Sequence, residues 1–331
     1  MELFLYILLL IAGFVGLIKG ADLFVDGSSA LARNFHVPGV IIGLTIVAMG
    51  TSFPELAVST SAAISGSNEI AISNVLGSNI FNLLVVLGFC ALFRTIPVEK
   101  MILKRDFPVC LLVAVVMLFV TCSGTLLNGS FMNMPVSADA GAVPRWFGLA
   151  LLGAFVLYII LLIVDAKKHP TEDDGDEKPM PVWKCFLFIL IGAALIVAGG
   201  QAVVISAKYV ARAAGMSETL IGLTVVALGT SLPELVTSIV AAKKGEVGMA
   251  VGNAVGSSIF NAMLILGVSS AIHPFAVNTA SLFDMIIQIA VVAVTLLFSA
   301  TGKGITRFKG FLMILMYAAD VVFAILREGA I

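Results

Sequence analysis

The sequence predicts an all-α polytopic membrane protein with ten transmembrane helices, and three observations support this fold class. Of the 331 residues, 60% are apolar and 12% are charged, whereas charged residues make up about 25% of an ordinary soluble domain. The apolar residues gather into ten runs, most of about 17–25 residues, which is long enough to cross a bilayer. A long segment of the first half also reappears in the second half. We therefore expect two repeats of five helices each.

The ten predicted spans follow one another with short polar connections. In chain order we expect them at residues 3–31, 39–64, 69–92, 106–122, 146–164, 183–210, 219–242, 248–270, 281–300 and 306–326. The first and the sixth are longer than the hydrocarbon core requires, so we expect them to be tilted. The chain start lacks a basic segment and a cleavage motif, which favours a true first span over a signal peptide.

Two polar stretches are predicted to be loops. Residues 123–145 are rich in Gly, Ser, Asn and Pro, and residues 165–182 contain the acidic run 172–177 together with prolines. The acidic run lacks the alternating ligands of an EF-hand loop, so it is interpreted as a solvated linker. The predicted organisation is a first five-helix repeat over 1–165, a cytoplasmic linker over 166–182 and a second five-helix repeat over 183–331.

The distribution of Lys and Arg predicts the orientation in the membrane. If the N-terminus lies outside, most of the 19 basic residues fall in loops on the cytoplasmic side, as the positive-inside rule requires. We therefore expect a cell-membrane protein with both termini extracytoplasmic. Its expected partners are the lipid bilayer and the cations discussed below, with no nucleic acid and no bound cofactor. The four scattered cysteines (Cys90, Cys110, Cys122 and Cys185) are interpreted as small apolar residues.

The internal repeat predicts that the two halves are inverted copies. Residues 42–88 align with 221–267 without a gap, and just over half of the aligned pairs are identical. Because each copy holds an odd number of spans, the second copy crosses the membrane in the opposite sense. Inverted repeats place a shared site near the midplane of the membrane.

Each repeat carries the pattern G-T-S-x-P-E inside a span, at 50–55 and again at 229–234. An ionisable group in hydrocarbon costs roughly 2.5–3.5 kcal/mol on insertion scales and is a functional-site hypothesis by default. The proline lacks an N–H and displaces a carbonyl of the preceding turn, so we expect a broken helix there. Broken backbone at this depth must be buried or line a polar cavity. The freed carbonyls and the hydroxyls would then act as ligands beside Glu55 and Glu234.

The next span of each repeat contributes a second polar set. Asn74, Ser78 and Asn82 are four residues apart and share one helix face, and so do Asn253, Ser257 and Asn261. Carboxylates with several neutral oxygens, and no His or Cys, suit Ca²⁺, which takes 6–8 oxygen ligands. They suit a transition metal poorly.

These segments resemble the two alpha-repeats of the cation/calcium exchanger superfamily, which includes the sodium/calcium exchangers. The resemblance rests on the doubled G-T-S-x-P-E and G-S-x-I-F-N segments, and it extends over the ten-span organisation. It implies antiport of Ca²⁺ against Na⁺ by alternating access, with Ca²⁺ bound chiefly by Glu55 and Glu234. The other residues that it implies around the cations are Thr51, Ser52, Ser78, Asn82, Thr230, Ser231, Ser257, Asn261 and the carbonyls of Ala48 and Ala227.

One departure from the resemblance leaves the coupling ion open. Many sodium/calcium exchangers carry Asp where this chain has Asn261, and Asn82 is also neutral. Two carboxylates can neutralise one Ca²⁺ or bind two protons, so Na⁺/Ca²⁺ and H⁺/Ca²⁺ exchange are both possible. K⁺-dependent exchange, another exported cation and a passive channel are further alternatives. An intramembrane hydrolase using Ser52 or Ser231 lacks a base, because all three histidines lie in predicted loops, so no enzyme is expected.

Three charged residues of the first span receive a separate interpretation. Lys19, Asp22 and Asp26 stand at positions i, i+3 and i+7 of one helix face. A mutual ion pair, or snorkelling of the side chains to the membrane surface, is favoured over a place on the ion path.

Overall fold

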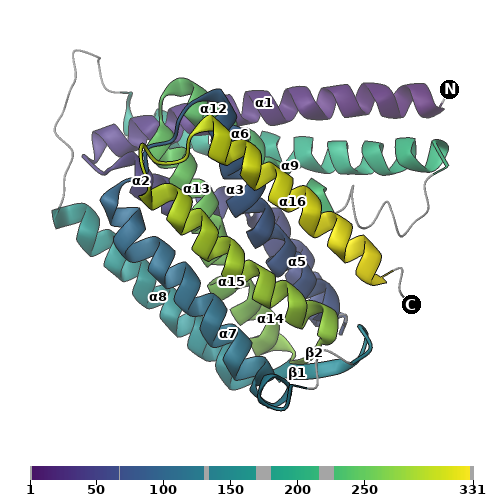
Figure 1. The fold of residues 1–331 in the computed structure, drawn as a ribbon. Helices are drawn as coiled ribbons and strands as arrows, with labels where there is room; N and C mark the ends of the chain where they lie inside the picture. Colours follow the sequence, from purple (N-terminus) through teal and green to yellow (C-terminus); the bar gives the residue numbers. More distant parts are fainter. Residues whose placement is uncertain (1, 67, 130–133, 169–179, 216–226, 329–331) are drawn as a thin grey trace. The chain divides into compact units, whose positions relative to one another are not determined.

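The computed structural model describes residues 2–66, 68–129, 134–168, 180–215 and 227–328 (Figure 1). The chain divides into two compact units. Unit 1 comprises Met1–Pro54 and Leu162–Gly256, and unit 2 comprises Glu55–Leu161 and Ser257–Ile331. Each unit combines segments from both halves of the sequence, so the units do not follow the predicted boundary at 166–182. The two-repeat organisation itself stays a prediction.

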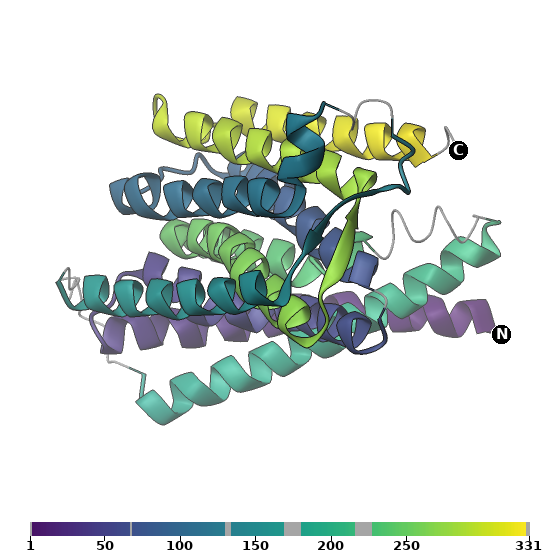
Figure 2. The ribbon, with the colours of Figure 1, turned by 90° about the horizontal axis from the view of Figure 1, so that it is seen from below.

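Two long helices dominate unit 1. They are α1 (Glu2–Asn34) and α9 (Val182–Ala213), which pack along each other (Figure 2). Glycines bring the two backbones together. A Cβ added to Gly20 would lie 2.8 Å from the backbone N of Ile196, and a Cβ added to Gly192 would lie 2.6 Å from the backbone N of Phe24. Lipid provides no hydrophobic driving force for helix association, so helix pairs are stabilised by the van der Waals contacts that small residues allow.

The remaining helices of unit 1 carry both hexapeptides. From the first half they are α2 (Gly39–Ile42), the π-helical turn η1 (Gly43–Val47) and α3 (Ala48–Thr51). From the second half they are α11 (Ala227–Gly229), α12 (Leu232–Lys244) and most of α13 (Val247–Phe260). Gly256 of α13 lies against Leu44, where an added Cβ would be 2.8 Å from the Cα atom. This contact holds α13 close to the segment that precedes the first hexapeptide.

Unit 2 is a helical bundle with three more π-helical turns. Its elements from the first half are α4 (Phe53–Ile64), α5 (Asn68–Phe81), η2 (Asn82–Val86), α6 (Leu87–Phe93), η3 (Ile102–Asp106), α7 (Phe107–Leu127) and α8 (Arg145–Lys168). Those from the second half are η6 (Asn261–Ile265), α14 (Leu266–Ile272), α15 (Thr279–Ala300) and α16 (Arg307–Glu328). α4 begins and α8 ends in unit 1. Within unit 2, α16 packs on α6 and α15 packs on α7 and α5.

Unit 2 also contains a two-stranded antiparallel sheet that the all-α prediction missed. Strand β1 (Asp139–Val143) pairs with β2 (Phe275–Asn278), with Val143 opposite Phe275. Val143 and Val277 are fully buried and Phe275 nearly so, so the strands are held by apolar burial as well as by the ladder. The region 123–145 is therefore not simply a loop: α7 runs to Leu127, and a strand follows.

The described helices are typical of a protein that crosses a membrane many times. Eight segments are long and apolar enough to span it, and the bent pair Gly39–Thr51 and Phe53–Ile64 adds a ninth among the residues described. The predicted seventh span, 219–242, begins within 216–226, outside the described residues. The count of ten spans therefore stays a prediction.

The glycine contact between α1 and α9 yields a stability prediction. Gly192→Ala should lower the melting temperature, because its methyl group would overlap the α1 backbone and overpacking costs about 1–3 kcal/mol. Gly153→Ala in α8 is the matched control, since nothing lies within 4 Å of a Cβ there. Thermal unfolding in detergent, followed by size-exclusion chromatography, measures both. Equal melting temperatures for the two variants would contradict the close packing of α1 on α9.

Candidate functional site

The central polar contact of unit 1 joins the two hexapeptides. Ser52 Oγ donates a hydrogen bond to Glu234 Oε1 at 2.8 Å, and both residues are fully buried. The second carboxylate oxygen of Glu234, Oε2, is buried without a hydrogen-bond partner in the described part of the chain. A buried carboxylate is costly unless it is paired or coordinates a metal, so Oε2 is a candidate cation ligand.

The backbone of the two hexapeptides explains how these side chains are placed. Ser52 leaves the helical conformation (φ −86°, ψ 9°) between α3 and α4, and the helices on either side are bent by 50°. Ser231 has nearly the same conformation (φ −95°, ψ 6°) at the start of α12. A proline then occupies the first turn of each following helix, where its missing N–H is tolerated. Glu55 and Glu234 come directly after these prolines.

Thr51 brings a hydroxyl and two carbonyls together beside the Ser52–Glu234 contact. Its Oγ1 lies 3.1 Å from the carbonyl of Val47 and 3.3 Å from that of Ala48. It also lies 3.1 Å from Oδ1 of Asn253 on α13. A hydroxyl has one proton to donate and two lone pairs, so these three acceptors are alternatives for the same proton.

In unit 2, the helix that carries Glu55 is tied to its neighbour by Asn74. Glu55 is fully buried in the first turn of α4. Asn74 on α5 donates through Nδ2 to Ser59 Oγ at 2.9 Å and lies 3.4 Å from the carbonyl of Glu55. Ser269 on α14 donates to the carbonyl of Ser59 at 3.4 Å. The backbone of α4 is thus fixed by neutral hydrogen bonds around its carboxylate.

Asn82 and Asn261, which the sequence predicted as equivalent ligands, each begin a π-helical turn that the sequence did not reveal. These turns are η2 and η6 respectively. Both amides are fully buried, and neither their oxygen nor their nitrogen has a hydrogen-bond partner within the described residues. The Ser257 hydroxyl is in the same situation. Because single π turns inside α-helices occur frequently at functional sites, these turns mark both asparagines as candidate ligands.

The predicted site residues are distributed over both units. Unit 1 brings together Ala48, Thr51, Ser52 and Glu234; it also contains the buried Ser231, the half-buried Thr230 and the start of α11 at Ala227. Unit 2 contains Glu55, Ser78, Asn82, Ser257 and Asn261, all buried. Since Glu234 and Glu55 belong to different units, one site that includes both of them stays a prediction.

The two long helices cover the hexapeptide glycines. A Cβ added to Gly50 would lie 2.6 Å from Cζ of Phe24 on α1. A Cβ added to Gly229 would overlap the side chain of Val204 on α9. Each hexapeptide therefore begins directly under a side chain of α1 or α9.

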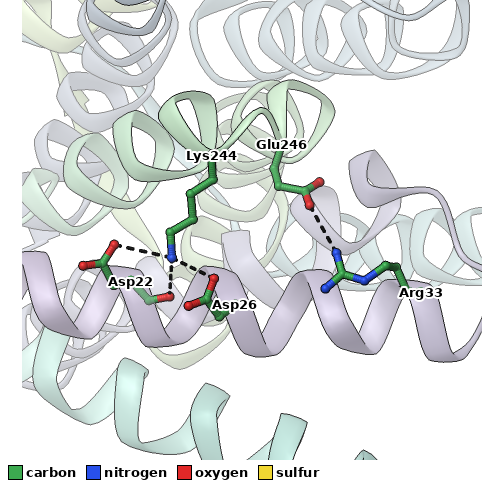
Figure 3. Close-up of polar contacts among 5 residues, drawn as sticks. All are labelled: Asp22, Asp26, Arg33, Lys244 and Glu246. Atoms are coloured by element: carbon green, nitrogen blue, oxygen red, sulfur yellow. Dashed lines mark hydrogen bonds and ion pairs between the residues drawn. The ribbon is translucent and has the colours of Figure 1, made fainter. Parts of the chain in front are cut away.

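Asp22 and Asp26 of α1 pair with Lys244 of α12, so the mutual ion pair with Lys19 that the sequence favoured is wrong. Snorkelling of these side chains, the other interpretation favoured from the sequence, stays a prediction. Lys244 Nζ lies 2.7 Å from Oδ1 of Asp26 and 3.4 Å from Oδ1 of Asp22, and it donates to the carbonyl of Asp22 at 3.1 Å (Figure 3). Arg33 lies 3.6 Å from Glu246 in the same region. The partner of both aspartates is thus Lys244 rather than Lys19. Sequence spacing could not reveal a partner more than two hundred residues away.

The chemistry available at these positions is that of oxygen ligands. The described residues contain no group of three or more His, Cys, Asp or Glu side chains that could hold a metal ion. The candidate ligands are instead hydroxyls, amides, carbonyls and single carboxylates, and hard cations such as Ca²⁺ prefer oxygen ligands of this kind.

Comparison with known proteins gives consistent results over nearly the whole chain. A family model described as "Sodium/calcium exchanger protein" matches residues 5–164 and 184–326. Putative antiporter CaxA of Alkalimonas amylolytica is 39% identical over 93% of this chain and 94% of its own length. Sodium/calcium exchanger MaX1 of Methanosarcina acetivorans is 34% identical over 95% and 97%. A solved structure of the sodium-calcium exchanger NCX_Mj, soaked with Na⁺ and Sr²⁺, matches 97% of this chain and 98% of its own with a TM-score of 0.81 and 29% identity.

The Ser52–Glu234 hydrogen bond yields a prediction that does not depend on activity. Ser52→Ala should lower the melting temperature of the cation-free protein, because a hydrogen bond to a charged group contributes about 1.5–3 kcal/mol. Ser299→Ala in α15 is the control, since the Ser299 hydroxyl is buried with no partner in the described structure. A larger loss for Ser299→Ala than for Ser52→Ala would contradict the contact.

Proposed function

This chain belongs to the sodium/calcium exchanger protein family, and we propose that it exchanges Na⁺ for Ca²⁺ at a single midplane site. Membership of the family makes it a multi-pass membrane protein and a cation/Ca²⁺ antiporter, not an enzyme. The observation that supports the finer proposal best is the buried Glu234 carboxylate. One of its oxygens accepts from Ser52, and the other has no partner among the described residues.

The proposed site uses only hard oxygen ligands. Glu55 and Glu234 supply the negative charge, and neutral oxygens complete the shell of 6–8 that Ca²⁺ requires. The neutral ligands that we assign are Thr51, Ser52, Ser78, Asn82, Thr230, Ser231, Ser257, Asn261 and the carbonyls of Ala48 and Ala227. Na⁺ ions and Ca²⁺ compete for the same carboxylates, so occupancy by one excludes full occupancy by the other. This competition is the basis of the coupling.

We assign the movement that alternates access to the site to the helix pair α1 and α9. Their glycine-mediated contact supports movement as one body, because neither backbone can shift without the other. Phe24 and Val204 lie over the first glycine of each hexapeptide, so displacement of the pair would uncover the ligands. The contacts of Lys244 with Asp22 and Asp26 would have to change in the same step.

The proposed topology is ten spans in two inverted repeats, 1–165 and 183–331, joined by a cytoplasmic linker at 166–182. Both termini lie outside the cell in this arrangement. It is supported by the ungapped alignment of residues 42–88 with 221–267 and by the excess of Lys and Arg in the loops assigned to the cytoplasm.

A second candidate function, H⁺/Ca²⁺ exchange, is favoured by one specific observation. Asn82 and Asn261 are neutral, so the proposed site holds two carboxylates. Two protons would neutralise them as fully as one Ca²⁺ does. A passive channel is disfavoured, since inverted halves around one site are typical of transporters that alternate their access.

The site assignment predicts that both glutamates are essential. Glu234→Gln and Glu55→Gln should each lower Ca²⁺ uptake into proteoliposomes by about 100-fold or more, because each removes half of the negative charge that offsets the dehydration of Ca²⁺. Asp139→Asn, an exposed carboxylate in β1, is the control and should leave uptake unchanged. Unaltered flux in either glutamine variant would show that the assignment is wrong.

Imposing a Na⁺ gradient and a pH gradient separately identifies the coupling ion. Radiolabelled Ca²⁺ uptake should follow an outwardly directed Na⁺ gradient at constant pH, because loss of bound Na⁺ frees the carboxylates. A pH gradient without Na⁺ should give little uptake. Uptake driven only by the pH gradient would instead establish the H⁺/Ca²⁺ alternative.

A further inference from the structure

The side-chain amide of Asn253 has a defined orientation. Its Nδ2 donates to Ser238 Oγ at 2.8 Å and lies 3.3 Å from the carbonyl of Glu234. A carbonyl oxygen only accepts hydrogen bonds, so the nitrogen must face Glu234. The amide oxygen, Oδ1, is therefore the atom that lies 3.1 Å from Thr51 Oγ1. Asn253 is fully buried, so water does not compete for these contacts.

This orientation matters because of the single proton on the Thr51 hydroxyl. A hydroxyl binds a cation through a lone pair, so its proton must point to an acceptor away from the cation. If the proton points to the carbonyl of Ala48, 3.3 Å away, it competes with the cation for that carbonyl. If it points to Asn253 Oδ1, 3.1 Å away, or to the carbonyl of Val47 at the same distance, both the Thr51 lone pairs and the Ala48 carbonyl remain available. Of these two acceptors, Asn253 is the one that also contacts the backbone of Glu234.

We propose that Asn253 is a positioning residue that accepts the Thr51 hydroxyl proton and thereby turns the lone pairs of Thr51 toward the transported cation. The same side chain also fixes the backbone of Glu234, so it holds the hydroxyl of one hexapeptide and the carboxylate helix of the other in register. This inference rests on the proposed cation site, to which it adds a residue that does not itself touch the ion.

The other half of the chain repeats the donor contacts of this arrangement at the equivalent asparagine, Asn74. Asn74 Nδ2 donates to Ser59 at 2.9 Å and lies 3.4 Å from the Glu55 carbonyl. The corresponding distances of Asn253 to Ser238 and Glu234 are 2.8 Å and 3.3 Å. The two arrangements lie in different units, so the donor contacts of the asparagine recur at both hexapeptides. Residues that orient metal ligands from outside the coordination shell typically change metal affinity by about 10–100-fold when they are replaced.

Asparagine is the side chain that meets all these demands. Aspartate offers an acceptor for Thr51 but no donor for Ser238 or for the Glu234 carbonyl. Leucine has a similar volume and offers neither. Comparing the two replacements therefore separates the acceptor function of Asn253 from its packing.

The test measures the half-saturating Ca²⁺ concentration and the maximal rate of radiolabelled Ca²⁺ uptake for Asn253→Leu, Thr51→Val and the double variant. Asn253→Leu should raise the half-saturating concentration about tenfold. It should add almost nothing in the Thr51→Val background, because the proton that it serves is gone. Asn79→Leu, which removes a buried amide from α5, is the control and should leave the half-saturating concentration unchanged.

Two outcomes would overturn the proposal. The first is that Asn253→Leu and Thr51→Val have additive effects on the half-saturating Ca²⁺ concentration. The second is that Asn253→Leu lowers the maximal rate and leaves the half-saturating concentration unchanged, as a purely structural role predicts. If Asn253→Leu does not fold, Asn253→Asp provides the same test: it should keep a Thr51-dependent affinity, and loss of that dependence would refute the role.

A binding readout separates this proposal from the proposed function. The shift in melting temperature on addition of CaCl₂ or NaCl reports cation binding whether or not the protein transports. A Ca²⁺-induced shift that Asn253→Leu reduces, in a protein that fails to exchange, would support the positioning role and reject Na⁺/Ca²⁺ exchange. A shift unaffected by Asn253→Leu would reject the positioning role alone.

Discussion

The need to accommodate a fully buried carboxylate shapes unit 1. Glu234 sits in the first turn of α12, where Ser52 donates to one of its oxygens and Asn253 lies within hydrogen-bonding distance of its backbone carbonyl. These partners come from different spans, and they meet because Gly256 lets α13 approach the segment before α3. The close packing of α13 and the placement of the Glu234 carboxylate therefore depend on each other. A larger residue at Gly256 would move α13, and with it Asn253, away from Glu234.

The protein meets this constraint with neutral groups. A buried Lys or Arg would neutralise the glutamate permanently and compete with any cation. The Ser52 hydroxyl satisfies one oxygen of the Glu234 carboxylate and leaves its charge in place. The same logic appears at Glu55, where Asn74 contacts the backbone and the carboxylate lies in the first turn of α4. Lys244, at the end of the helix that carries Glu234, is instead paired with aspartates of α1.

The sequence predicted the helical membrane fold, and the doubled hexapeptide drew attention to Ser52 and Glu234. Proline, glycine and apolar runs act locally, so such features can be read from composition and spacing. The π turns that begin at Asn82 and Asn261 could not be predicted, because the residues that follow each asparagine are all apolar, so the phase shift caused by one extra residue has no polar face to displace. The contacts of Asn253 with Thr51 and of Lys244 with Asp26 join residues about two hundred positions apart. Spacing along the chain does not indicate such pairs, and the tertiary structure does.

The interleaving of the two units has a consequence for how the protein is made. α1 leaves the ribosome about 150 residues before α9, a wait of roughly 8–30 s at ordinary rates of synthesis. During this time its glycine face must be covered by lipid or by the insertion machinery, and Asp22 and Asp26 wait still longer for Lys244. Neither half of the chain can complete a unit alone. The first half of the chain can therefore complete its folding only after the second half has been synthesised.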